Sequence, residues 1–157
     1  TIEDALSAHP AVQICAAVGA PDAYAGELPV AYVSLLPGAA ATESELMAFA
    51  ARGVDEAPAR PKSVVIMDKI PMTNVGKVYK PELRLLAAQA VVQSLVDQVA
   101  ARLELSAELV PRVSASEAQG IAVLVDDAAL QSRAAAVRDA LRAAIEPLPV
   151  KVSLQGR

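Results

Sequence analysis

A buried strand that ends in a loop containing proline and glycine is the feature that most constrains this sequence. The apolar run Ser63–Asp68 is typical of a buried strand. Pro71 prevents that strand from continuing, because it lacks an N–H and has a fixed φ. Gly76 permits positive φ and a close approach of the backbone to a ligand. The loop therefore places Lys77 just before the helical pattern that begins at Val78–Arg84.

Lys77 has a long cationic side chain, which can place a point charge beside an anion. On chemistry alone a solvated loop lysine is the more common case. A phosphate-binding P-loop is excluded, because Pro71 stands where that pattern needs glycine and Val78 where it needs serine or threonine. A contact between Lys77 and phosphate would therefore be made by a projecting side chain.

Composition limits the number of domains and the classes of partner that this chain can have. The 157 residues suit one domain, or one domain with a small appendage. There is no tryptophan, the aromatic content is 3% and the net charge is −4, so a nucleic-acid partner is not expected. No apolar run approaches the roughly 18 residues needed to span a bilayer. No signal peptide is evident, and we expect a cytoplasmic location.

The sequence predicts no metal site and no disulfide. Cys15 is the single cysteine and lies in an apolar run, which is typical of a small core residue. His9 is the single histidine and stands at the end of a predicted helix, where a structural hydrogen-bonding role is expected. One histidine and one distant cysteine do not make a zinc site.

Residues 1–84 are expected to form a small α+β domain of about three strands with packed helices. Thr42 and Glu45 have the spacing of a capping box. Gly19–Glu27 is rich in turn residues and predicts a loop. The predicted elements are a helix over 1–9, a strand over 11–18, a strand over 28–36, a helix over 43–52 and a strand over 63–68.

Residues 85–157 are expected to form a second small α+β unit, with the order helix, strand, strand, helix, strand. Its pattern contains no histidine, cysteine or glycine-rich loop, and we assign it no chemistry. The predicted elements are a helix over 86–104, strands over 110–114 and 121–125, one helix from Asp126 or Asp127 to Ile145 and a strand over 150–154.

The stretch Pro71-Met72-Thr73-Asn74-Val75-Gly76-Lys77, followed by Leu83-Arg84, resembles the final core motif of the AMP-forming acyl-CoA synthetases and their relatives, Pro-x-Thr-x-x-Gly-Lys. The resemblance covers residues 1–84. Other segments that agree in order and spacing are Ile2–Leu6 with His9–Val12, Val18–Asp22 with Gly26–Glu27, Val30–Val33 with Pro37–Gly38, and Arg60–Lys62.

The resemblance implies that residues 1–84 are the mobile C-terminal domain of a longer enzyme, and that 85–157 are an extension of unknown role. The chain starts without methionine, which also suggests a fragment. In the family, ATP and CoA are substrates, and Mg²⁺ is expected with the large N-terminal domain rather than here. The matching lysine, Lys77, is then catalytic in forming the acyl adenylate, and Thr73 and Gly76 lie on the ATP side. The fragment alone is expected to be inactive and to bind no cofactor.

For the CoA side, the resemblance implies Arg60 and Lys62, which match a basic pair, together with Tyr24 and Gly26. Arg60 and Lys62 suit phosphate, but two solvated charges are an equally good interpretation. Ala25 stands where relatives often carry an aromatic residue that stacks on the CoA adenine, and Tyr24 beside it is the candidate to replace that residue.

Two other interpretations stay open. The chain could be a regulatory or oligomerisation module, with the extension as the candidate for homodimer formation. It could also be a peptide-synthetase adenylation subdomain, although Ser114 and Ser116 lack the context of a carrier-protein serine. The acyl substrate is not encoded here, and a fatty acid is our expectation from the resemblance.

Overall fold

The computed structural model describes residues 1–156, which divide into two compact units. The first unit comprises Thr1–Ala20 and Glu27–Arg84. The second comprises Pro21–Gly26 and the chain from Leu85 onward. We describe each unit by itself.

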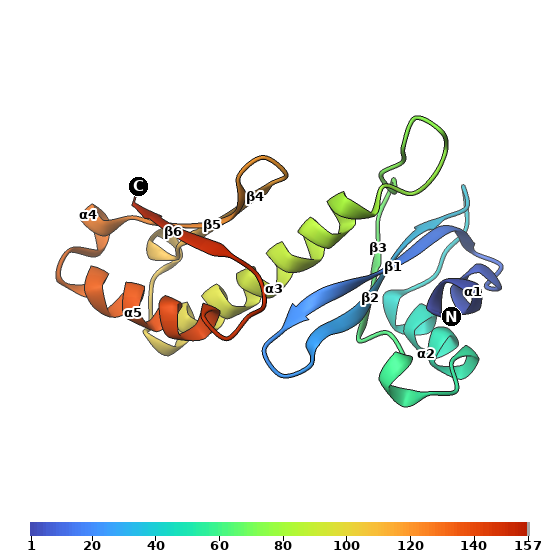
Figure 1. Ribbon diagram of the computed structural model, residues 1–157, viewed down its shortest axis with the longest axis horizontal. Coiled ribbons are helices and arrows are strands. Elements are labelled where there is room, and N and C mark those ends of the chain that lie inside the picture. Colours follow the sequence, from blue (N-terminus) through green and yellow to red (C-terminus); the bar gives the residue numbers. More distant parts are fainter. Residues whose placement is uncertain (157) are drawn as a thin grey trace. The chain divides into compact units, whose positions relative to one another are not determined.

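The first unit is built on a three-stranded sheet with the order β1-β2-β3 (Figure 1). Strands β2 and β3 are parallel, with Val30 opposite Ser63 and Val33 opposite Ile66. This agrees with the predicted α+β fold of about three strands. The elements are α1 (Ile2–Ser7), β1 (Val12–Asp22), β2 (Gly26–Leu35), α2 (Glu43–Gly53), η1 (Ala57–Ala59), β3 (Ser63–Ile66) and the start of α3 (Lys80–Arg102).

The hairpin between β1 and β2 differs from the prediction. Strand β1 runs to Asp22, through residues predicted as a loop, and the turn is confined to Ala23–Ala25. Asp22 closes this turn by accepting hydrogen bonds from the N–H groups of Tyr24 and Ala25, at 2.9 and 2.8 Å. Pairing with β2 outweighs the local breakers, and Pro21 is tolerated because β1 is an edge strand.

Local signals set the helix starts of this unit. Thr42 caps α2: its hydroxyl accepts from the N–H of Glu45, whose carboxylate accepts from the N–H of Thr42, both at 3.1 Å. The predicted capping box is therefore confirmed. Thr1 and Asp4 form the same motif at α1. Helix α3, by contrast, begins at Lys80, earlier than predicted, because Pro81 is well tolerated in a first turn.

One core cluster of the first unit joins α1 and α2 to the sheet. Leu6 of α1 and Leu46 of α2 are fully buried with Ala31 and Val33 of β2. Helices α1 and α2 approach closely at Gly53, where an added Cβ would lie 2.8 Å from Cβ of Ala5. Side chains alternate along a strand, so Tyr32 points to the opposite face, where it is also buried.

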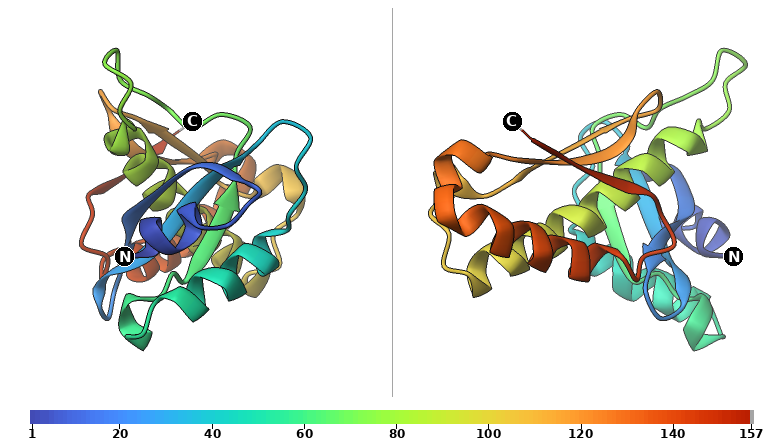
Figure 2. Two further views of the ribbon diagram at one scale, coloured as in Figure 1. Left: turned by 90° about the vertical axis from the view of Figure 1, so that its right-hand side faces the viewer. Right: turned by 60° about the vertical axis from the view of Figure 1, so that its left-hand side comes forward.

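The second unit has a sheet of its own, ordered β4-β5-β6. Strands β4 and β5 are antiparallel, and β5 and β6 are parallel. Figure 2 shows α5 along this sheet, and residues of α3, β5 and α5 form one core cluster. The elements are the rest of α3, η2 (Ala107–Leu109), β4 (Arg112–Ser116), β5 (Gly120–Val125), α4 (Asp127–Leu130), η3 (Gln131–Arg133), α5 (Ala134–Ile145) and β6 (Val152–Gly156).

The predicted order of elements in this unit is confirmed, but the predicted single helix ending at Ile145 is wrong. It is broken into α4, η3 and α5, and Gln131 has a φ of 53°. Asp126 caps α4 by accepting from the N–H of Ala129 at 3.0 Å. The break allows Arg138 of α5 to bind Asp127 of α4 through two hydrogen bonds, at 2.7 and 2.5 Å.

We expect the Asp127–Arg138 pair to make the stability of the second unit depend on acidic pH. The hydrogen bonds from Arg138 lower the pKa of Asp127 below its ordinary value of 3.8. A carboxyl group whose pKa falls on folding stabilises the fold above its unfolded pKa, and this contribution disappears as the pH falls through the folded pKa. Wild type should therefore be more stable than Asp127→Asn at pH 7, and this difference in stability should shrink as the pH falls below 3.8 and through the lowered pKa of Asp127. Thermal unfolding across pH tests this, and a difference that is constant with pH would contradict it.

Within residues 1–156, no helix is long and apolar enough to cross a membrane. No three histidine, cysteine, aspartate or glutamate side chains in that part of the chain gather closely enough to hold a metal ion.

Candidate active-site loop

The candidate site is the loop between β3 and α3, which Figure 1 shows in green, projecting from the sheet. Its two strands pair at the base. The N–H of Tyr79 donates to the carbonyl of Pro71 at 2.8 Å, and Met72 and Val78 form an antiparallel bridge. The loop is therefore a short hairpin with a defined stem.

The tip of this hairpin is closed by Thr73. Its N–H donates to the carbonyl of Lys77 at 2.6 Å, and its hydroxyl accepts from the N–H of Lys77 at 3.1 Å. The carbonyl of Thr73 accepts from Gly76 at 3.1 Å. Gly76 has a φ of 80°, the positive value for which glycine was predicted. These bonds fix the backbone on both sides of the Lys77 peptide.

The side chain of Lys77 is exposed, and within residues 1–156 its ammonium has no hydrogen-bond or ion-pair partner. Val75 beside it is 82% exposed. The ammonium of Lys77 is thus a free cation at the end of a long side chain, and the backbone that carries this side chain is fixed by hydrogen bonds. That arrangement suits electrostatic stabilisation of an anion brought to the tip.

The hairpin is anchored on both sides of its stem. On the incoming side Ile70 is buried, and on the outgoing side Leu83, in the first turn of α3, is fully buried. Between the stem and Leu83, the ammonium of Lys80 binds the carboxylate of Glu3 at 2.7 Å.

Glu3 joins three elements of the first unit. The same carboxylate oxygen, Oε1, accepts from Lys80 of α3 and from the N–H of Ala17 in β1, at 2.7 and 2.9 Å. Burial alone would raise the pKa of Glu3, but the hydrogen bonds from Lys80 and Ala17 outweigh it and hold that pKa below its usual value. Glu3 is therefore charged at neutral pH. Sequence analysis missed this residue, because its partner lies 77 positions away.

The residues predicted for the CoA side lie outside the loop between β3 and α3. The Nε of Arg60 donates to the carbonyl of Val54 at 2.9 Å, so part of its function is to hold the connector before β3. Lys62 is exposed, Tyr24 is fully exposed in the β1–β2 turn, and Gly26 has a φ of 81°. The binding functions of these four residues, and of Thr73 and Gly76, stay predictions.

His9 and Cys15 have the structural environments predicted for them. The Nδ1 of His9 accepts from the N–H of Ala11 at 3.1 Å, and its ring packs edge-on against Phe49. The thiol of Cys15 is half-buried and donates to the carbonyl of Glu3 at 3.3 Å. Burial raises the pKa of this thiol.

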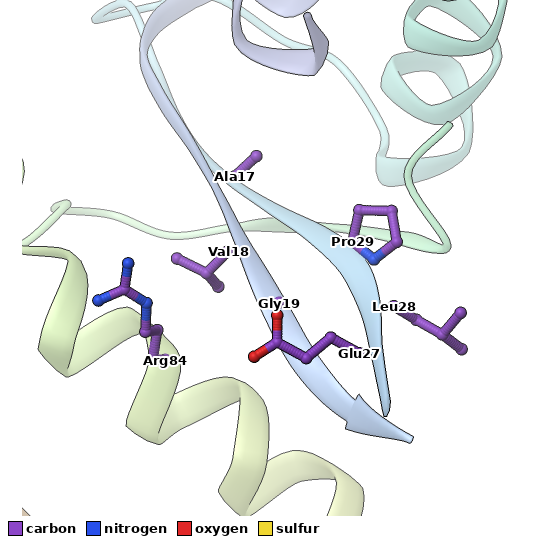
Figure 3. Close-up of a pocket in the computed structure, with 7 residues that line it drawn as sticks. All are labelled: Ala17, Val18, Gly19, Glu27, Leu28, Pro29 and Arg84. Carbon is purple, nitrogen blue, oxygen red and sulfur yellow. The ribbon is translucent and has the colours of Figure 1, made fainter. Parts of the chain in front are cut away.

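A shallow pocket of about 360 Å³ lies beside β1 and β2 in the first unit (Figure 3). Glu27 and Arg84 line it, and neither has an ion-pair partner among residues 1–156. The carboxylate of Glu27 lies over Gly19, where an added Cβ would be 2.2 Å from Oε2. In this arrangement the carboxylate of Glu27 occupies the space that a Cβ at position 19 would need. The sequence pattern did not indicate this pocket.

If Lys77 acts in acyl-adenylate formation, as the resemblance implies, Thr73→Val should slow that step in the intact protein about 2- to 10-fold. Valine keeps the shape but removes the acceptor of the Lys77 N–H, and one such bond contributes about 0.5–1.5 kcal/mol. Thr73→Ser keeps the hydroxyl and is the matched control. Steady-state kinetics separate the two functions considered for Thr73: loss of the loop bond lowers kcat, whereas a lost contact with ATP raises the KM for ATP. Equal rates for the Val and Ser variants would contradict the loop function.

The motif and its geometry agree with a known family. The family of AMP-binding enzyme C-terminal domains matches residues 1–77. Just under half of the chain therefore matches a domain of this family. The match ends at Lys77 itself, so it contains the whole tip of the loop.

Curated relatives extend the similarity beyond this domain. The chain is 35% identical over 147 residues to a marinolic acid–CoA ligase of Pseudoalteromonas sp. (strain SANK 73390), a match that covers 94% of this chain and 22% of that protein. It is 45% identical over 92 residues to an acetyl-coenzyme A synthetase of Deinococcus radiodurans, covering 59% of this chain and 14% of that protein. The chain thus spans less than a quarter of the length of these relatives.

A solved structure shows the same fold for the first half of the chain. The acyl-CoA synthetase of Brucella canis aligns with a TM-score of 0.50 and 34% identity, over 55% of this chain and 16% of that protein. The marinolic acid–CoA ligase match, at 94% of this chain, includes most of the second unit as well. The second unit therefore has a counterpart in at least one CoA ligase.

Proposed function

We propose that this chain is the C-terminal part of an AMP-forming acyl-CoA ligase, and that Lys77 is its catalytic residue. The observation that carries the proposal is the free ammonium of Lys77 at the tip of a hydrogen-bonded hairpin, within a domain of the AMP-binding family. Residues 1–84 are proposed as the mobile catalytic domain and 85–157 as its extension. The N-terminal domain of the same enzyme is the proposed partner.

In the first half-reaction a substrate carboxylate oxygen attacks the α-phosphorus of ATP, and pyrophosphate leaves. Negative charge gathers around the attacking and phosphoryl oxygens. Lys77 would lie beside them and stabilise that charge through its own fixed charge, which is electrostatic catalysis. A lysine in this function needs reach and a rigid support, and the closed tip of the loop supplies the support.

In the second half-reaction the CoA thiolate attacks the acyl carbonyl carbon, the bond to the phosphate oxygen breaks, and AMP leaves. Lys77 has no function in this step. We propose that the domain rotates as a rigid body between the two steps and brings the residues predicted for the CoA side, Arg60, Lys62, Tyr24 and Gly26, towards the adenylate.

Mg²⁺ is expected to accompany ATP in the N-terminal domain. Residues 1–156 contain no cluster of side chains that fits a metal ion, so no step here is derived through one. The acid is also selected outside this chain. We propose a carboxylic acid substrate, with a fatty acid as the specific expectation, in a cytoplasmic enzyme.

The proposal is tested with the intact protein that contains this chain. ATP, CoA and a panel of carboxylic acids are supplied, and the nucleotide products are separated. We expect AMP and pyrophosphate to form only when a suitable acid is present, and acyl-CoA to form in equal amount. Release of ADP and phosphate, or AMP release without acyl-CoA, would contradict it.

A further inference from the structure

We propose that Glu3 is a positioning residue for Lys77: its carboxylate holds Lys80 and so fixes the outgoing strand of the Lys77 hairpin. The inference rests on the function proposed above for Lys77. It concerns a residue at the opposite end of the domain sequence, outside the Pro-x-Thr-x-x-Gly-Lys motif.

The first support is the geometry of the contact. Oε1 of Glu3 accepts from Nζ of Lys80 at 2.7 Å and from the N–H of Ala17 at 2.9 Å. The side chains of Glu3 and Lys80 are 39% and 38% exposed, so the pair is partly shielded from solvent. The carbonyl of Glu3 also accepts from the thiol of Cys15 at 3.3 Å. The backbone and the carboxylate of Glu3 are thus both held by β1.

The second support is the position of Lys80 in α3. It is the first residue of the helix, where the partial positive charge of the helix dipole makes a lysine unfavourable. The paired carboxylate of Glu3 offsets that cost. Glu3 itself lies in the first turn of α1, where an acidic residue is favourable. The carboxylate of Glu3 therefore places negative charge near the N-termini of both α1 and α3.

The third support is the mechanics of the hairpin. The incoming strand is held by the buried side chain of Ile70. The outgoing strand passes from Lys77 through Val78 and Tyr79 directly to Lys80. Only two residues separate the catalytic lysine from the anchored one, so release of Lys80 loosens one side of the stem. The ammonium of Lys77 then samples more positions, and misplacement by about 1 Å can cost up to 10²-fold in rate.

The test compares variants of the intact ligase in the two half-reactions. Glu3→Gln and Lys80→Gln are each expected to lower kcat of adenylation about 10-fold, with the KM values for ATP and acid changed less than about 2-fold. Transfer of a preformed acyl adenylate to CoA should stay within about 2-fold of wild type. Lys80→Arg keeps the ion pair and should restore adenylation.

Two further variants sharpen the comparison. The double variant Glu3→Gln/Lys80→Gln should be no slower than either single variant, because the two residues act through one contact. Glu82→Gln is the matched control: this exposed carboxylate lies in the same turn of α3 and has no ion-pair partner within residues 1–156. It should leave both half-reactions unchanged.

The outcomes separate this inference from the proposed function. Slow adenylation in Lys77→Ala with normal adenylation in Glu3→Gln and Lys80→Gln would overturn the positioning function alone. Normal adenylation in Lys77→Ala would overturn both proposals. Equal losses in both half-reactions for Glu3→Gln and Lys80→Gln, together with a lower melting temperature, would show a general structural function and would also overturn the inference.

Discussion

Replacing Lys77 by alanine in the intact protein is expected to slow the proposed formation of acyl adenylate by about 10²- to 10³-fold, the usual cost of removing one group that stabilises transition-state charge. The fold should not change, because the side chain is exposed and its ammonium has no hydrogen-bond or ion-pair partner within residues 1–156. Carboxylic-acid-dependent exchange of pyrophosphate into ATP measures this step alone.

Lys69→Ala is the matched control for Lys77→Ala. Lys69 is also an exposed lysine at the same end of β3, on the incoming side of the loop, and it has no ion-pair partner in the described part of the chain. It should exchange pyrophosphate at the wild-type rate. A similar loss in both variants would mean that general positive charge, and not the place of Lys77, supports the reaction.

The second large effect concerns stability. Leu46→Ala and Leu141→Ala should each lower the free energy of unfolding by about 2–5 kcal/mol, because both side chains are fully buried and their removal leaves a cavity. Leu46 belongs to the core of the first unit and Leu141 to that of the second. Denaturant unfolding of the chain measures the loss, and Leu36→Ala, whose side chain is 42% exposed, should cost much less.

Hydrogen exchange on these two variants also tests the division into domains. If residues 1–84 and 85–157 fold as separate domains, Leu46→Ala should weaken amide protection in the first unit and leave β5 and α5 protected. Leu141→Ala should do the reverse. Loss of protection throughout the chain in either variant would show one cooperative unit and would contradict the proposed boundary.

Features that depend on neighbours in sequence were predictable. Thr42 and Glu45 cap α2 through a contact three residues apart, and the pattern of capping residues shows this directly. The positive φ of Gly76 and the placement of Lys77 at a loop tip were also expected from local chemistry.

Features set by tertiary pairing were predicted less well. Strand β1 extends to Asp22 because β2 pairs with it, which the local glycine and proline signals oppose. The helix predicted up to Ile145 breaks at Gln131, where no proline or glycine marks the break. The contact between Glu3 and Lys80 spans 77 positions and has no local pattern at all.

The central claim is that Lys77 acts in one half-reaction and is absent from the other. The most direct measurement supplies Lys77→Ala ligase with preformed acyl adenylate and CoA, and follows acyl-CoA formation in single turnover. The account predicts a rate close to wild type, in an enzyme whose pyrophosphate exchange is nearly lost. A loss of similar size in both reactions would contradict a domain that presents Lys77 for adenylation and then turns it away.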